Sequence, residues 1–528
     1  MSFVELLARL GGMGRFQVTY VAALAVPLLM LASHNLLQNF TAGVPEHHCR
    51  PRALANATPA DVPVLVSIPW DSHRRPQRCR RYLEPQWHLL DVNGSANATE
   101  AATEPCHDGW TYLNGIFTDT IVTEWDLVCD SKKLRQVAQS IYMAGILLGS
   151  GLFGVLSDKF GRRALLTWCY LQLGATGVGT AAAPSLVVYC LCRFLTGLAM
   201  AGVTLNSASL CMEWIPTEAR AVVGTINGYC YTLGQFVLVA AAFGLPRWRQ
   251  LQLVVSLPFF VFFFYSWYGT LQCPPPVSTP SVHPQSPPPV STLSAHLQCP
   301  PSVPTPVPSS RGSPQALRAL VRREPPLPGG AVAALVRTPG MRTVSCGVSF
   351  VWFSTSFAYY GLAMDLQGFG FNVYLSQLVF GAVDIPAKLL SVLVISWLGR
   401  RLAQGGSLAL AGLCILANIF VPSELPTLRM AFAVVGKGAL AASFNCAYIF
   451  TGELFPTVIR QTGMGLGGTM ARVGGMVAPL VRMAADVTPV LPLVIYGAAP
   501  IVSAIATCFL PETRNAPLPE TVKDVERR

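Results

Sequence analysis

The chain has 528 residues, of which 52% are hydrophobic and only 12% are charged, and its mean hydropathy is +0.45. A soluble protein carries about 25% charged residues, so this composition excludes a soluble globular protein and indicates a chain that crosses a membrane many times. The net charge of +11 does not indicate a nucleic-acid partner, because the sequence offers no soluble domain with a basic patch and interleaved aromatic residues.

Twelve apolar stretches approach the length of about 20 residues that a membrane-spanning helix requires. They lie at 16–37, 134–156, 164–182, 185–210, 221–243, 250–268, 345–366, 373–397, 404–422, 426–451, 460–482 and 490–510. The short amphipathic segment 1–15 precedes the first stretch, which is long enough to remain in the membrane as an anchor rather than to act as a cleaved signal peptide. The sequence therefore predicts an all-α polytopic membrane protein with twelve transmembrane helices.

The first predicted loop, 38–130, has the features of a glycosylated segment in an oxidising compartment. It contains all four N-x-S/T sequons of the chain, at Asn39, Asn56, Asn93 and Asn97. Their restriction to one loop predicts a glycosylated, extracellular face. The same loop contains Cys49, Cys79, Cys106 and Cys129. Four cysteines predict two disulfides with three possible pairings, and the competing interpretation is that the thiols are free.

Basic residues are concentrated in other short loops. Lys159, Arg162 and Arg163 follow the second predicted span, and Arg400 and Arg401 follow the eighth. The positive-inside rule places such loops in the cytoplasm. With twelve spans, the N-terminal segment and the tail 511–528 are then cytoplasmic as well, and the loop 38–130 lies on the opposite side.

Two motifs occur once in each half of the chain. EWIPTEAR at 213–220 aligns with ELFPTVIR at 453–460, and the same offset aligns Gly234 with Gly474; a Gly-Arg-Arg turn also occurs in each half. The chain is therefore predicted to consist of two similar six-helix halves, 16–268 and 339–510, as in many secondary transporters. The residues expected to latch and release the halves are Asp158, Gly161, Arg162, Arg163, Glu213, Arg220, Gly399, Arg400, Arg401, Glu453 and Arg460. The competing interpretation is that these charges determine only the membrane topology.

The segment between the halves, 269–338, is rich in proline. Three copies of a 13-residue unit fill 271–309. This density of proline is incompatible with a helix or a central strand, so the segment is predicted to be a flexible cytoplasmic linker of polyproline type. Binding of a proline-recognising domain is the alternative.

Two basic residues lie in the middle of predicted spans: Arg472 in the eleventh and Lys388 in the eighth. A charged side chain at the centre of a membrane helix costs roughly 2.5–3.5 kcal/mol on insertion scales, and such residues normally face a water-filled cavity or a partner. The guanidinium group of arginine binds carboxylates and sulfonates in a bidentate manner, and the ammonium group of lysine supplies a movable point charge. Both residues are therefore candidate ligands of an anion. For Lys388 the alternative is an ion pair with Asp384, one helical turn away. Lys437 is a third cation within a span, and it is expected to line the substrate path or to lie near its end.

Aromatic and polar residues of neighbouring spans are expected to line the same cavity. Rings and hydroxyl groups beside a cation suit an organic anion with an apolar body, although packing alone can explain each ring. The candidates are Tyr229, Tyr231, Tyr359, Tyr360, Phe444, Tyr448 and Asn35.

The sequence lacks the motifs of the main enzyme classes. It has no phosphate-binding loop, no apparent hydrolytic triad and no cysteine or histidine spacing typical of a metal site. We therefore expect no enzymatic activity, no cofactor, no metal and no use of ATP. Acidic residues within the spans are few, chiefly Asp384, which argues against coupling to protons.

Several longer motifs resemble a known family. GVLSDKFGRR at 154–163 resembles the signature turn of the major facilitator superfamily, and ASHNLLQNFTA at 32–42, GAVDIPAKLL at 381–390 and RQTGMGLGGTMARVGG at 460–475 resemble the organic anion transporters of solute carrier family 22. The resemblance implies the major facilitator fold and a plasma-membrane location among membrane lipids. It also implies substrate binding by the basic pair of Lys388 and Arg472. The implied activity is sodium-independent exchange of small carboxylates and sulfate conjugates, with a dicarboxylate as counter-ion.

The chain departs from this family after residue 267. Relatives continue the sixth span into an acidic, serine-containing motif and a bundle of cytosolic helices, whereas this chain continues into the proline repeats. The alternative function is therefore a variant that does not transport and acts at most as an interaction protein. A cation transporter is disfavoured, because the predicted cavity contains two cations and no paired acid at the eleventh span.

Overall fold

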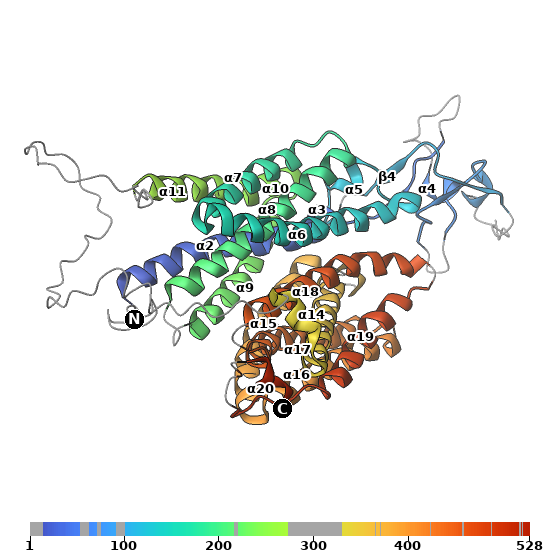
Figure 1. The fold of residues 1–528 in the computed structure, drawn as a ribbon. Coiled ribbons are helices and arrows are strands. Elements are labelled where there is room, and N and C mark those ends of the chain that lie inside the picture. Colours follow the sequence, from blue (N-terminus) through green and yellow to red (C-terminus); the bar gives the residue numbers. More distant parts are fainter. Residues whose placement is uncertain are drawn as a thin grey trace, which may run out of the picture.

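The computed structural model describes residues 14–52, 63–70, 75–90, 101–113, 115–215, 220–272, 330–364, 366–369, 371–422, 424–456, 459–486, 488–516, 519 and 521–527. Figure 1 shows two groups of helices, the first half in blue to green and the second half in yellow to red, lying side by side. The end of the bundle that carries the loop 38–130 is called the loop end, and the end at which the segment 273–329 joins the halves is called the linker end.

The helices of the first half follow the predicted spans. They are α2 (Arg15–Leu36), α6 (Lys132–Phe160), α7 (Arg162–Ala181), α8 (Leu186–Trp214), α9 (Arg220–Gly244), α10 (Trp248–Ser256) and α11 (Pro258–Gln272). The sixth span, predicted as one helix over 250–268, is divided between α10 and α11. Pro258 causes this break, because it has no N–H group to continue the helical hydrogen bonds.

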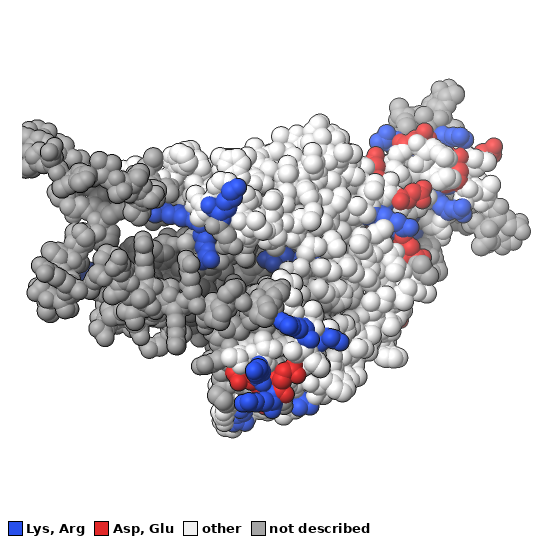
Figure 2. Space-filling model, in the orientation of Figure 1, with Lys and Arg blue, Asp and Glu red and all other residues white. Residues whose placement is uncertain are grey.

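The second half repeats this arrangement. Its long helices are α14 (Pro339–Ala363), α15 (Val373–Leu398), α16 (Arg400–Phe420), α17 (Pro426–Leu454), α18 (Arg460–Arg482) and α19 (Leu491–Thr507). The short elements η4 (Leu366–Phe369) and η5 (Met483–Asp486) lie at the loop end. In the described part of the chain, eight helices are long and apolar enough to cross a membrane by length and composition, and α19 is apolar but has only 17 residues. On the visible face, Figure 2 shows a largely uncharged surface over the middle of the helices, with charged groups gathered over the loop and near α20.

The two halves pack in the same way. In the first half α6 lies on α8 and α2 on α9, and in the second half α15 lies on α17 and α14 on α18. The halves meet through equivalent helices as well, because α6 contacts α18 and α9 contacts α15. The repeated Gly-Arg-Arg motif forms an equivalent turn in each half, where Gly161 has φ +86° and Gly399 has φ +93°. Glycine adopts these angles without a steric penalty.

The loop at the loop end forms a small disulfide-bonded unit. Strand β1 (His47–Cys49) pairs with β4 (Trp110–Tyr112), and β2 (Arg80–Tyr82) pairs with β3 (Thr103–Pro105), both antiparallel. The unit also contains α3 (Gln38–Thr41), α4 (Val64–Ser67), η1 (Trp87–Leu90), α5 (Ile121–Glu124) and η2 (Cys129–Ser131). Of the three possible pairings, the structure has Cys49 bonded to Cys106 and Cys79 bonded to Cys129.

The four sequons of this loop have different places in the structure. Asn56, Asn93 and Asn97 lie outside the described residues. Asn39 lies in α3, and its side-chain nitrogen donates hydrogen bonds to Ala363 O at 2.8 Å and to Gln377 Oε1 at 3.1 Å. A glycan would replace one of the two hydrogens on this nitrogen and so break at least one bond to the second half, which does not fit the expectation of an accessible acceptor.

Part of the predicted linker is helical. The proline repeats at 271–309 lie almost entirely outside the described residues, but α13 (Gly330–Arg337) forms a helix within the segment predicted to be linker. Proline ends at Pro328 in this segment, and the apolar residues Ala334 and Leu335 pack into a core of the second half. The C-terminal tail also folds back as α20 (Val522–Glu526), where Glu526 Oε1 accepts hydrogen bonds from Gly340 N and Met341 N at the start of α14.

Candidate functional site

Arg472 lies in the middle of α18 and faces two other helices of the second half. Its guanidinium interacts electrostatically with Tyr360 of α14 and Tyr448 of α17. No carboxylate of the described residues forms an ion pair with it. The position of Arg472 follows from close packing of α18 on α14: a Cβ atom on Gly474 would lie only 2.4 Å from Phe353 O. The glycine-rich sequence around Arg472 thus brings the cation close to the rings of α14.

Aromatic side chains of α14 and α17 form a wall beside this cation. The ring of Phe444 lies 5.4 Å from that of Tyr359, which in turn lies 5.6 Å from that of Tyr360. Trp352, which the sequence analysis missed, completes the wall, with its ring 4.7 Å from that of Tyr448. The side chain of Tyr448 is 58% exposed, whereas those of Trp352 and Tyr359 are buried, so the wall is open at Tyr448 and packed into the core at its other members. The spacing of seven residues between Trp352 and Tyr359 is the sequence signal that could have identified the tryptophan.

A chain of hydroxyl and amide groups connects the first half to this wall. Tyr142 OH donates to Asn35 Oδ1 at 2.8 Å, and Asn35 Nδ2 donates to Tyr231 OH at 3.2 Å. The side chains of Tyr231 and Tyr360 interact electrostatically across the two halves. Asn35 and Tyr231, which were expected to line the site, belong to this chain of groups, and Tyr142 was not anticipated.

Lys388 contacts the first half instead of its expected acidic partner. Its Nζ atom donates to Gly228 O at 2.8 Å and to Thr232 Oγ1 at 3.0 Å, both in α9, and lies 6.0 Å from the ring centre of Tyr229. The alternative of an ion pair between Lys388 and Asp384 is wrong, because Asp384 pairs with Lys437 instead. Lys388 therefore joins α15 to α9 in this conformation.

Lys437 is a structural charge. Its Nζ atom lies 2.8 Å from Asp384 Oδ1 and donates to Phe380 O at 2.7 Å, and its side chain is fully buried. The expectation that Lys437 lines the path is corrected by this geometry, since a paired and enclosed ammonium group cannot reach a ligand. Gln235 of α9 donates to the other oxygen of Asp384 at 3.1 Å, so the ion pair also contacts the first half.

Sequence reasoning also missed Arg193 of α8. This side chain is 1% exposed, lies 4.1 Å above the ring of Tyr142 and donates to Gln139 Oε1 at 3.4 Å. No carboxylate of the described residues pairs with it. A cation inside a predicted span is the same signal that identified Arg472, and it was available at position 193.

The candidate latch residues are only partly described. The side chains of Asp158, Glu213 and Arg220 lie outside the described residues. In the second half, Arg400 Nε lies 3.0 Å from Glu453 Oε2, and Glu512 accepts the backbone N–H groups of Arg400 and Arg401. These contacts join α16, α17 and the tail within one half. The latch hypothesis requires contacts between the two halves, and these contacts do not provide them.

The described polar contacts between the halves lie at the loop end and in the middle of the bundle. At the loop end Lys132 Nζ lies 2.6 Å from Asp486 Oδ1, and Ser140 Oγ donates to Met476 O at 3.2 Å. Tyr374 OH donates to Ala242 O at 3.4 Å. The structure is therefore closed at the loop end.

Comparison with known proteins gives two results. The family model described as Major Facilitator Superfamily matches residues 113–479. Solute carrier family 22 member 6-B of Xenopus laevis is 49% identical over 537 residues, which cover 100% of this chain and 95% of the relative. Solute carrier family 22 member 6 of Oryctolagus cuniculus is 48% identical over 530 residues, with 100% and 95% covered.

Two solved structures share the fold. The structure titled "Inward open conformation of the xylose transporter XylE from E. coli" has a TM-score of 0.58 at 13% identity and covers 97% of this chain and 99% of its own. A structure of a D-xylose-proton symporter has a TM-score of 0.56 at 14% identity, with 94% and 98% covered. These similarities establish the architecture of two six-helix halves and carry no information on the substrate.

Proposed function

Because this chain belongs to solute carrier family 22 of the major facilitator superfamily, it is a membrane transporter, and we propose that it exchanges small organic anions that bind at Arg472. The substrate class is carboxylates and sulfate conjugates, and the counter-ion is a dicarboxylate. The family and the fold are those of membrane transporters, not of enzymes.

One observation carries the proposal: the guanidinium of Arg472 has no carboxylate partner in the described residues and lies beside an aromatic wall. An unpaired cation in a membrane helix is costly, and an anionic ligand would reduce that cost. The fork of N–H donors suits a carboxylate or a sulfate group. Tyr359, Tyr360, Phe444, Tyr448 and Trp352 provide apolar area for the body of an organic anion.

Lys388 connects substrate binding to movement of the halves in this proposal. Its ammonium group holds α15 to α9 through Gly228 O and Thr232 Oγ1. A charge-assisted hydrogen bond to a carboxylate is stronger than one to a neutral carbonyl. An anion at Arg472 that attracts Lys388 would weaken this contact between the halves and favour their movement in alternating access.

The proposed location is the plasma membrane, with the loop end outside and both termini in the cytoplasm. The basic turns at Gly161 and Gly399 support this orientation under the positive-inside rule. The disulfide-bonded loop agrees with an oxidising exterior. We propose that Asn56, Asn93 and Asn97 carry glycans, and that Asn39 does not, because its side chain contacts Ala363 and Gln377.

Uptake of labelled estrone sulfate tests the function. Cells expressing the chain, Arg472→Ala or Arg472→Lys are compared after normalisation to surface protein by biotinylation. We expect saturable uptake that succinate loaded inside the cells accelerates. Arg472→Ala should lower uptake about tenfold or more, since a hydrogen bond to a charged group contributes roughly 1.5–3 kcal/mol. Arg472→Lys should retain part of the activity.

Two outcomes would contradict the proposal. Uptake that is equal in Arg472→Ala and the unaltered chain would exclude Arg472 from the substrate site. A chain that reaches the surface and takes up neither estrone sulfate nor small carboxylates would instead be the non-transporting variant.

A further inference from the structure

A second polar site lies at the loop end, where the two halves meet. It is a cavity of about 40 Å³ between α3 and α6 of the first half and α14, η4 and α18 of the second. Its lining consists of Gln38, Asn39, Ala42, Arg135, Gln136, Gln139, Met364, Leu366, Gln367 and Arg482. A buried water needs about 10–15 Å³ of such space, so the cavity can hold a compact ion.

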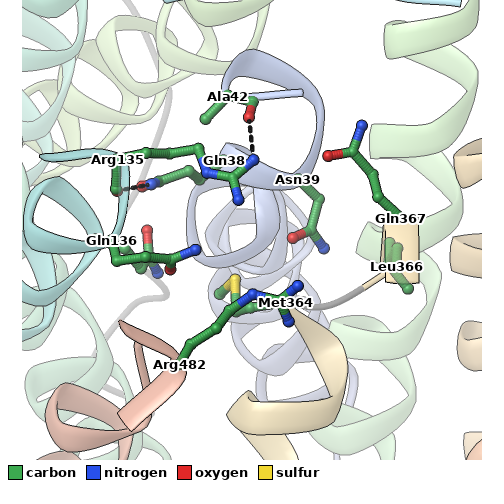
Figure 3. A pocket seen from close by; sticks show the side chains of 10 residues that line it. Gln38, Asn39, Ala42, Arg135, Gln136, Met364, Leu366, Gln367 and Arg482 are labelled. Carbon is green, nitrogen blue, oxygen red and sulfur yellow. Dashed lines mark hydrogen bonds between the residues drawn. The ribbon is translucent and has the colours of Figure 1, made fainter. Parts of the chain in front are cut away.

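The described residues of the lining include two positive charges and no negative one. Figure 3 shows the side chains of Arg135 and Arg482 extending into the pocket from opposite sides. Arg135 lies in the first turn of α6 in the first half, and Arg482 is the last residue of α18 in the second half. The other polar lining residues are amides, and the described lining contains no carboxylate. Two guanidinium groups with amide neighbours form a set of hydrogen-bond donors typical of an oxyanion site.

The donors are held in place by hydrogen bonds with other residues of the lining and with Arg193 behind it. Arg135 Nη1 donates to Ala42 O at 3.2 Å, and Gln38 Nε2 donates to Arg135 O at 2.6 Å. Gln139 is only 1% exposed, and its Oε1 accepts a hydrogen bond from the buried Arg193 at 3.4 Å. Within the described part of the chain, the Nε2 atom of Gln139 has no hydrogen-bond partner. A buried donor without a partner is costly, and here it belongs to a residue that lines the cavity.

We propose that this pocket is an anion site separate from the one at Arg472, in which Arg135, Arg482 and Gln139 Nε2 bind a compact oxyanion of the size of sulfate. Because the two guanidinium groups come from opposite halves, the complete site exists only when the loop end is closed. An anion that binds one conformation better than another shifts the population toward it. Sulfate therefore stabilises the conformation that is closed at the loop end.

Binding of labelled sulfate to the purified full chain in detergent, at constant ionic strength, tests the site. The variants are Arg472→Ala, Arg135→Gln with Arg482→Gln, and the charge-conserving Arg135→Lys with Arg482→Lys. We expect saturable binding that Arg472→Ala retains. The double glutamine variant should lose affinity about tenfold or more, because it removes two charged donors, and the double lysine variant should retain most of it.

A second variant tests the site independently of whether the double glutamine chain folds. Gln139→Leu keeps both arginines and removes the unpartnered donor, so it should weaken sulfate binding severalfold in a chain that elutes as a single species. Sulfate binding that persists when the double glutamine substitution is combined with Arg472→Ala, that disappears in Arg472→Ala alone, or that is absent from the unaltered chain would overturn the site.

Cross-linking tests the effect on conformation. Ser140 and Met476 contact each other between the halves, so Ser140→Cys with Met476→Cys reports closure of the loop end. A protease site introduced within 273–329 separates the halves on a non-reducing gel unless that disulfide has formed, because both native disulfides lie within the first half. Sulfate should increase the rate of cross-linking severalfold, and only when Arg135 and Arg482 are present. An unchanged rate at saturating sulfate would disprove the coupling.

Discussion

At the residue scale, three cations of the second half have three different environments, and the environment decides the role of each. Lys437 is enclosed and paired with Asp384. Lys388 donates to a backbone carbonyl and a hydroxyl group of the first half. Arg472 has aromatic neighbours and no acidic partner among the described residues. Of these three cations, only Arg472 has neither an ion pair nor a hydrogen bond among the described residues, so it is the proposed anion ligand.

The Lys437–Asp384 pair gives a stability prediction. Asp384→Asn leaves the buried ammonium group of Lys437 uncompensated, and breaking a buried pair in this way destabilises a protein by about 3–5 kcal/mol. We expect a lower thermal unfolding temperature in detergent and less protein at the cell surface. Asp384→Asn combined with Lys437→Met, which removes both charges, should recover much of the loss. A single variant as stable as the unaltered chain would show that the pair contributes nothing.

At the element scale, close contact between the first and fifth helices of each half is the feature that positions the site. A Cβ atom on Gly234 of α9 would lie 2.1 Å from Leu29 O of α2, and one on Gly474 of α18 would lie 2.4 Å from Phe353 O of α14. The two glycines, which align in the sequence repeat, therefore have the same role in the two halves. In the second half this contact brings Arg472 beside Tyr360.

Two glycines of α18 provide a matched pair for testing this packing. Gly474→Ala places a methyl group against a backbone carbonyl and forces α18 away from α14, and overpacking of this kind costs about 1–3 kcal/mol. We expect reduced thermal stability and reduced uptake per surface molecule. A Cβ atom on Gly465, in the same helix, meets nothing within 4 Å, so Gly465→Ala should change neither. Equal effects of the two substitutions would contradict the packing argument.

At the scale of the whole molecule, contacts at the loop end hold the halves together. Asp486 of η5 lies 2.6 Å from Lys132 Nζ and 3.4 Å from Lys133 Nζ. The hydrogen bond from Lys132 holds the pKa of Asp486 below its usual value. A carboxylate with a lowered pKa contributes to the closed state above its ordinary pKa of about 3.9, and the contribution is lost as the pH falls through the lowered pKa.

Because the pKa of Asp486 is lowered, its contact with Lys132 and Lys133 is predicted to be insensitive to pH in the physiological range. Uptake of estrone sulfate should show no change attributable to Asp486 between about pH 5.5 and about pH 7.5, a range above the ordinary carboxyl pKa. Asp486→Asn should lower the KM for external substrate at every pH in this range, because it favours the conformation open to that side. Asp130→Asn, which removes an exposed acid of η2, is the control. An equal KM in both variants would exclude Asp486 from the gate.

Most of the fold was predictable from the sequence because hydrophobicity is a local property. Membrane-spanning stretches need about 20 apolar residues, and each of the twelve predicted stretches coincides with a helix or, at Pro258, with two. The repeats at Gly161 and Gly399 predicted the division into halves, and the structure repeats their turn geometry. The cation at position 472 was also evident, since an arginine in an apolar run is conspicuous.

The partners of individual side chains were decided only by the tertiary structure. Lys388 and Lys437 are both within reach of Asp384 in principle, and helix packing alone selected Lys437. The tertiary structure alone also decided the pairing of Cys49 with Cys106 and the place of Trp352 in the aromatic wall. The sequon at Asn39 suggests an exposed residue, but in the structure its amide contacts the second half. The amino-acid sequence fixes which segments cross the membrane, because burial in lipid depends on each segment by itself. Which charges meet depends on distances between helices that are far apart in the chain, and those distances exist only in the assembled bundle.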